Sequence, residues 1–342
     1  MSVVAAPLLD SSIAATVAAP PDRLWRRVLA SRRAVWGGGG LLFILLLSFG
    51  SLPWTRFSKT SSIQYNLQHD QFSRIPPSFG DRPADMEATD WNNQQAKLAD
   101  YESHMNFGHL WRWLGTDTQA RSLLGRCLFG GVISLSIGFA AAAISVVLGV
   151  TVGLVAGYRG GWVDATLMRV VDVLYGLPYI LLVILFRIAF EQANSMVVLF
   201  LAIGLVSWLT MARVVRGQVL SLRAQPFIEA ARAAGITETR IFLYHLLPNL
   251  VGPIIVYASL TIPSAILQES FLSFLGVGIQ SPLPTWGSLA SDGLQPALNT
   301  IHSDWWLLLF PCTLLAFVLL CLNFLGDGLR DVFDPRNEAA KI

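Results

Sequence analysis

Long uncharged runs, separated by polar or charged segments, form the main pattern of this sequence. Five of them are 19 residues or more in length: residues 36–54, 127–158, 192–212, 246–268 and 305–325. A helix of about 20 apolar residues crosses the roughly 30 Å hydrocarbon core of a bilayer. The pattern therefore predicts five membrane-spanning helices, and a less apolar stretch, residues 163–190, is predicted to form a sixth.

That less apolar stretch carries charged side chains. Arg169 and Asp172 are three positions apart, so a helix would place them on one face as an ion pair. Charges inside a membrane usually face protein or water, which makes the two a candidate pathway-lining or helix-locking pair. An equally good interpretation is that both side chains lie close enough to the lipid headgroups to reach them, with no role in a pathway. Pro178 is expected to kink this helix.

A third candidate for a pathway or helix-locking residue is Glu269, which directly follows the run 246–268. It lies about 21 residues into that helix, and at about 1.5 Å per residue this places it near the far side of the bilayer.

The distribution of basic residues predicts the topology. Fifteen of the 24 Lys and Arg lie in the N-terminal tail, around the start of the third span, in the central polar loop or after the last span, whereas the short segments of the opposite side hold one. By the positive-inside rule both termini are expected in the cytoplasm, with six spans between them. The predicted parts are a cytoplasmic tail (1–35), span one (36–54), an extracytoplasmic loop (55–126) and a core (127–342) with spans two to six, a cytoplasmic loop (213–247) and the C-terminal tail.

Composition agrees with a membrane protein and excludes several kinds of chemistry. The chain is 54% hydrophobic and 13% charged, against about 25% charged for soluble domains. A net charge of +2 gives no argument for nucleic acid. We expect no metal site, and Cys127, Cys312 and Cys321, which lack CxxC spacing, are expected to be small buried hydrophobic residues. No phosphate-binding loop and no hydrolase or metalloprotease motif occurs, so we expect neither bound ATP nor an active site.

Small residues mark one face of the second predicted span. Gly149, Gly153 and Gly157 recur every four residues. In lipid, such faces let two helices approach closely, because packing replaces the hydrophobic driving force. A helix that is merely rich in small residues is the equal alternative at any one of these glycines.

The central polar loop predicts two short helices. Phe227, Ala230, Ala231 and Ala234 recur at helical spacing before Gly235, which is expected to end the first helix. Thr237 is placed to cap a second helix, whose apolar face would consist of Ile241, Tyr244 and Leu247. Two helices that meet at a glycine beside a membrane form a knob that another protein could bind.

This loop resembles the cytoplasmic EAA loop of bacterial ABC importer permeases. The residues that carry the resemblance, and that it marks as the ATPase-docking loop, are Glu229, Ala230, Ala231, Ala234, Gly235, Leu247 and Pro248. Three further segments resemble the dipeptide and oligopeptide branch of these permeases: residues 113–126, 269–287 and 326–336. In the first of them Ala120 stands where the branch has glycine, and Ser122 where it has aspartate.

The resemblance implies an all-α membrane protein with the type I importer fold. Such a permease is half of a heterodimeric pore, joined by a second permease subunit, two ATPase subunits that hold ATP and Mg²⁺, and an extracytoplasmic solute-binding protein. It implies peptides as solutes, no cofactor on this chain, and a place in the bacterial inner membrane. The external residues 55–126 and 276–304 are expected to meet the binding protein.

The sequence leaves other functions open. Similar permeases carry nickel, glutathione or peptide-like compounds, so the solute is not fixed by the sequence. A self-sufficient secondary transporter would be expected to show internal repeats or charged relays within its spans, and a membrane enzyme would need catalytic polar residues at depth.

Overall fold

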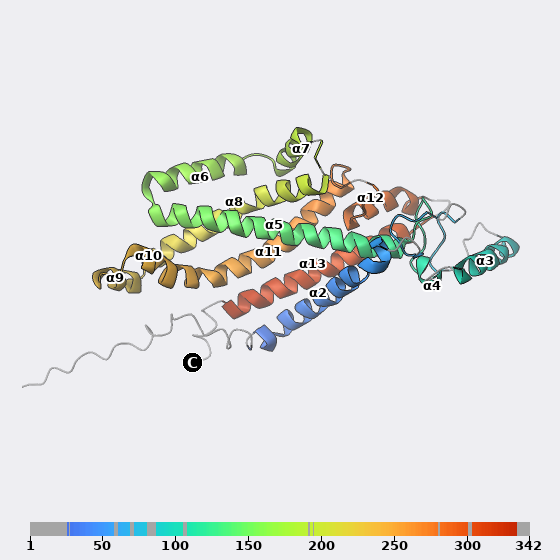
Figure 1. The fold of residues 1–342 in the computed structure, drawn as a ribbon, viewed down its shortest axis with the longest axis horizontal. Coiled ribbons are helices and arrows are strands. Elements are labelled where there is room, and N and C mark those ends of the chain that lie inside the picture. The colour runs from blue at the N-terminus through green and yellow to red at the C-terminus, as the bar shows by residue number, and fades with distance from the viewer. Residues whose placement is uncertain are drawn as a thin grey trace, which may run out of the picture.

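The described part of the chain is almost entirely helical. In a computed structural model of the protein it comprises residue 26 and residues 28–57, 61–68, 72–80, 87–104, 108–190, 192–193, 195–279, 281–299 and 303–333. Figure 1 shows an elongated bundle, in which long helices run side by side and shorter ones lie at the two ends and along one side.

Five helices of the described residues are long and apolar enough to cross a membrane. They are α2 (Arg32–Gly50), α5 (Leu123–Arg159), α8 (Ser195–Arg223), α11 (Leu247–Phe274) and α13 (Trp306–Phe333), and α2 continues through a π-helical turn, η2 (Pro53–Phe57). They correspond to the five uncharged runs. Helix α8 extends past the predicted end at residue 212, so part of the predicted loop 213–247 is helical. Helix α11 continues through Pro253 and Pro263.

The sixth predicted span is a broken pair of helices and not one kinked helix. Helix α6 (Gly161–Tyr175) and helix α7 (Tyr179–Ala189) meet at 89°. Pro178 cannot donate a backbone hydrogen bond and disfavours helical geometry at the residue before it. Gly176 directly after α6 weakens the junction further, so the helix breaks where a kink was expected.

The segments between the spans contain helices that the sequence pattern did not reveal. They are α3 (Ala88–Ser103), α4 (Gly108–Trp111) and α12 (Trp286–Ala297). Leu98 of α3 and Trp111 of α4 are both fully buried, in a cluster with Ile63, Phe72 and Ile75. Figure 1 places α3, α4 and α12 at one end of the bundle.

Helix α12 is packed into the bundle against α5, α11 and α13. Thr285 and Ser288 form a reciprocal capping box at its start. Trp286 is buried, and its indole N–H donates to the Cys127 carbonyl of α5 at 3.0 Å. Residues 276–304, expected to be an external loop, therefore include a helix that closes one end of the bundle.

The glycine face of α5 packs against α8, as predicted. A Cβ atom on Gly153 would lie 2.6 Å from the Ala212 carbonyl oxygen and 2.8 Å from the Val215 Cβ. Gly149 and Gly157 face Met211 and Val219 in the same way. Side chains at these positions would force the two helices apart, which accounts for the spacing of four.

The three cysteines are free, but they do not share one environment. Cys127 and Cys321 are buried, as expected, whereas Cys312 is exposed. The prediction for Cys312 was wrong, because its position on α13 is not covered by the described segments. Within the described ranges no three His, Cys, Asp or Glu side chains are grouped to hold a metal ion.

Candidate functional site

The central polar loop forms a helix, a glycine turn and a second short helix. Helix α9 (Pro226–Ala233) begins at a proline, a residue suited to a first helical turn. Gly235 has φ +76°. Its N–H donates to the Arg232 carbonyl at 2.9 Å, and the Ile236 N–H donates to the Ala231 carbonyl at 3.1 Å. This is the Schellman arrangement that ends a helix at glycine.

The second helix is short. Helix α10 (Glu238–Ile241) begins after Thr237, which holds the N-cap position without a side-chain hydrogen bond. A π-helical turn, η3 (Phe242–Leu246), then leads directly into α11. In Figure 1 the α9–α10 pair lies at the end of the bundle where α2 begins and α13 ends.

The buried face of this pair differs from the predicted one. Ile228 and Ala231 of α9 pack against Ile241 and Leu246. Ala230 and Ala234, predicted on the apolar face, are exposed, and Phe227 is half-buried. Tyr244, also predicted on that face, is 71% exposed.

The outer face of the pair therefore carries small and charged residues. Of the seven candidate docking residues, five are exposed: Glu229, Ala230, Ala234, Gly235 and Pro248. Leu247 is half-buried and packs with Val219 and Leu250 at the start of α11. Ala231 is the buried one, so it supports the pair from inside.

The charges of the loop pair across the glycine turn. Arg232 does not pair with Glu229 of its own helix; its Nε donates to Glu238 Oε1 at 2.8 Å. This hydrogen bond raises the pKa of Arg232 above its ordinary value. Glu229 is exposed and makes no ion pair within the described part of the chain. Its carboxylate is open to a partner.

The end of α5 holds the loop in place. The phenolic oxygen of Tyr158 lies 2.5 Å from Glu238 Oε2 and 2.9 Å from the Glu238 carbonyl oxygen. Arg223, the last residue of α8, donates to the carbonyls of Gly157 and Tyr158 at 2.8 Å each. A cation at a helix C-terminus satisfies carbonyls that lack helical partners.

The predicted ion pair between Arg169 and Asp172 does not form. Asp172 Oδ1 accepts from Arg213 Nη2 at 2.7 Å, and Arg213 also lies over the Tyr175 ring at 4.1 Å. Arg169 is exposed. Asp164 binds Arg216 through both carboxylate oxygens. Helix α6 is thus attached to α8 by two ion pairs between the helices, which spacing along one helix could not show.

Glu269 is fully buried where α5, α11 and the start of α12 meet. Its carboxylate accepts from Ser273 at 2.7 Å, from Ser134 of α5 at 3.1 Å and from Ser270 at 3.4 Å. The Ser134 hydroxyl oxygen in turn accepts a hydrogen bond from the backbone N–H of Trp286 of α12 at 3.3 Å. In this conformation the carboxylate contacts protein hydroxyls and not solvent.

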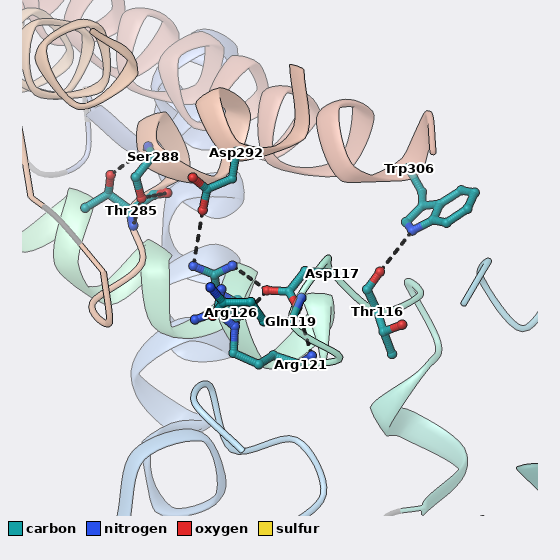
Figure 2. Close-up of polar contacts among 9 residues, drawn as sticks. All are labelled: Thr116, Asp117, Gln119, Arg121, Arg126, Thr285, Ser288, Asp292 and Trp306. Carbon is teal, nitrogen blue, oxygen red and sulfur yellow. Dashed lines mark hydrogen bonds and ion pairs between the residues drawn. The ribbon is translucent and has the colours of Figure 1, made fainter. Parts of the chain in front are cut away.

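A buried network of charges, at the end of the bundle away from the α9–α10 pair, was not predicted (Figure 2). Asp117 accepts the backbone N–H groups of Gln119 and Arg121, the Arg121 Nε at 2.8 Å and the Arg126 Nη1 at 2.6 Å. Arg126 also reaches Asp292 of α12 at 3.5 Å. The sequence did contain a signal for this network, because Asp117, Arg121 and Arg126 all belong to the segment 113–126 that resembles the peptide-permease branch.

The local backbone accounts for the residues that the branch has at both positions. Ala120 has φ +56°, a left-handed conformation that glycine adopts more readily. Ser122 is the N-cap of α5, and its side chain accepts the Gly125 N–H at 3.3 Å. Serine and aspartate are comparable N-cap residues, so Ser122 supplies the cap that aspartate would supply at this position.

Comparison with known proteins places these features in a family context. Residues 149–339 match the family described as binding-protein-dependent transport system inner membrane component. The matched residues include α9, the glycine turn and α10.

Individual relatives match over most of the chain. The oligopeptide transport system permease protein OppC of Haemophilus influenzae is 44% identical over 266 residues, covering 78% of this chain and 80% of that protein. The dipeptide transport system permease protein DppC of Bacillus subtilis is 44% identical over 224 residues, or 66% and 68% of the two chains. Among solved structures, a chain of the MetNI methionine ABC transporter in an inward-facing conformation aligns with TM-score 0.49 and 19% identity, over 59% of this chain and 93% of that one.

Proposed function

This chain belongs to the family of binding-protein-dependent transport system inner membrane components, and from that premise we propose that it is a permease subunit of an ABC importer for peptides. The observation that carries the proposal is the family match over residues 149–339, which include the glycine-turned helix pair. In the proposed assembly this chain forms half of the pore, and a second homologous permease forms the other half.

The solute class is inferred from the relatives. OppC and DppC are named for oligopeptide and dipeptide transport, and each is 44% identical to this chain. We therefore assign di- or oligopeptides as the transported solutes, received from an extracytoplasmic binding protein. The end of the bundle with α3, α4 and α12 is the surface proposed to meet that protein.

Coupling to ATP hydrolysis is assigned to the α9–α10 pair. Its exposed face, with Glu229, Ala230, Ala234 and Gly235, is the proposed docking surface for an ATPase subunit. Its other face is anchored on the bundle through Ile228 and neighbouring apolar residues. ATP and Mg²⁺ would be held by the two ATPase subunits.

The assignment requires the α9–α10 end to be cytoplasmic and the opposite end to be outside, with both termini in the cytoplasm of a bacterial inner membrane. Single cysteines at Ser78 and Thr237, both exposed, test this in a variant without the native cysteines. An impermeant thiol reagent added to sealed cells should label Ser78→Cys alone. Labelling of Thr237→Cys would contradict the proposed orientation, because it would place the α9–α10 end outside the cell.

The test of function is reconstitution. The chain, its partner permease, the ATPase subunits and the binding protein are placed in lipid nanodiscs, and ATP hydrolysis is measured with a peptide mixture. We expect hydrolysis to rise only when both binding protein and peptides are present. Stimulation by a non-peptide solute, with none by peptides, would overturn the solute assignment; no stimulation by either would overturn the function.

A further inference from the structure

One carboxylate outside the proposed docking surface connects three helices at the end of the bundle where that surface lies. Glu238 accepts a hydrogen bond from Tyr158 of α5 at 2.5 Å and another from Arg232 of α9 at 2.8 Å, while belonging itself to α10. The Tyr158 hydroxyl also faces the Glu238 carbonyl at 2.9 Å. Contacts from three elements thus converge on one residue.

Apolar packing supports the same junction. The Tyr158 ring packs edge-on against Phe242, with ring centroids 5.2 Å apart. Tyr158, Phe242 and Leu222 border two clusters at once, the core between α5, α8 and α11 and the core of the α9–α10 pair. The ring places the hydroxyl at Glu238, and the hydroxyl then fixes the angle between the pair and α5.

These polar contacts orient the α9–α10 pair more than they stabilise the fold. The side chains of Arg232 and Glu238 are 36% and 56% exposed. Ion pairs as exposed as this contribute little to stability. Two hydrogen bonds that converge on one carboxylate nevertheless restrict the orientation of the helix that carries it.

We propose that Glu238 and Tyr158 are positioning residues that hold the α9–α10 pair in register with α5, so that a movement imposed on the pair reaches the membrane helices. This inference rests on the proposed function, because it assumes that an ATPase subunit moves the pair. Neither residue is assigned a contact with the ATPase or the solute.

The test uses the complete importer in nanodiscs or liposomes. Tyr158→Phe removes only the hydroxyl and keeps the ring packing, whereas Glu238→Ala removes the shared acceptor. Each should lower the number of peptides transported per ATP hydrolysed roughly threefold to tenfold, the range for loss of one hydrogen bond. Both variants should retain the wild-type amount of bound ATPase subunits.

Two further variants separate positioning from a general structural effect. Glu238→Gln keeps a side-chain oxygen for the Tyr158 proton and should recover most of the coupling. Tyr175→Phe is the matched control, because its hydroxyl has no hydrogen bond within the described ranges, and it should match the wild type. The double variant Tyr158→Phe/Glu238→Ala should lose less coupling than the product of the two single losses, because Glu238→Ala already removes the side-chain acceptor of the Tyr158 hydroxyl and leaves it only the backbone carbonyl of residue 238.

The outcomes distinguish this inference from the proposed function. If the wild-type importer shows no peptide-stimulated hydrolysis, the proposed function fails before the variants are compared. If the wild type is coupled and Tyr158→Phe behaves like Tyr175→Phe, the positioning role is wrong. Loss of bound ATPase subunits in Tyr158→Phe, or additive losses in the double variant, would also overturn it, because either result indicates docking or separate roles.

Discussion

Replacing Asp117 by alanine should destabilise the protein more than any single change at an exposed ion pair. The carboxylate receives four hydrogen bonds, two from backbone N–H groups and two from guanidinium groups, at distances of 2.6 to 2.9 Å. Asp117, Arg121 and Arg126 are 5%, 3% and 2% exposed. The two guanidinium groups therefore have little access to water in its place.

The size of the effect follows from this burial. Removing one partner of a buried charge pair costs about 3–5 kcal/mol, because the remaining charge stays buried without compensation. Among the described residues, Arg126 would then keep Asp292 as its one acidic partner, whose contact is 3.5 Å long and whose side chain is 58% exposed. For a protein of 342 residues, this loss of unfolding free energy corresponds to a fall in the unfolding midpoint of roughly 4–7 °C.

The assay is thermal unfolding of the purified protein in detergent. The folded fraction is measured by size-exclusion chromatography of samples heated to increasing temperatures. Arg33→Ala is the control, since it breaks an exposed pair with Asp331 that is expected to contribute ~0–1 kcal/mol. Asp117→Asn keeps one acceptor for the backbone donors and should fall between the two. If Asp117→Ala melted together with Arg33→Ala, the reasoning from burial and hydrogen bonding would be refuted.

Three further changes test other parts of the structure. Ala120→Gly should leave the midpoint unchanged or raised, because relief of about 1–2 kcal/mol of left-handed strain is offset by the roughly 0.5–1 kcal/mol entropic cost of glycine; a clear fall would contradict this. Gly153→Leu should lower the midpoint by overpacking against Val215, at about 1–3 kcal/mol, whereas Gly217→Leu, which has open space around it, should not. Gly235→Glu should still insert and fold, because a Cβ there meets nothing within 4 Å and the left-handed backbone adds only about 1–2 kcal/mol of strain, yet it should abolish peptide-stimulated ATP hydrolysis; wild-type coupling would remove the loop from the transmission path.

Features that depend on local periodicity could be predicted from the sequence. The uncharged runs correspond to the five long helices, because length and apolarity are sufficient criteria for a span. The glycine face of α5 was predicted, since small residues repeated every four positions in a membrane helix favour the close approach of a second helix. The turn at Gly235 followed from the need for a positive φ at a helix end.

Features that depend on contacts between distant segments could not be predicted from the sequence. Asp172 pairs with Arg213, 41 positions away on another helix, and not with Arg169 three positions away. Similarly, Arg232 turns toward Glu238 across the glycine turn.

The position of Tyr244 has a separate cause. A helix of constant pitch through residues 241–247 would bury it, but the π-helical turn η3 adds a residue to that turn. The buried pair is therefore Ile241 and Leu246, five positions apart, and Tyr244 faces outward. Hydrophobic spacing alone contains no signal for such a turn.

The length of α5 gives the molecule a lever. Its 37 residues contain no proline, and at about 1.5 Å per residue they extend about 55 Å, well beyond the roughly 30 Å hydrocarbon core. One end carries Arg126 of the buried charge network, and the other carries Tyr158. A rocking of this rod by about 10° around its midpoint would move each end by about 5 Å in opposite directions, by the geometry of a rigid helix. A small displacement at one membrane surface would thus become an equal and opposite one at the other.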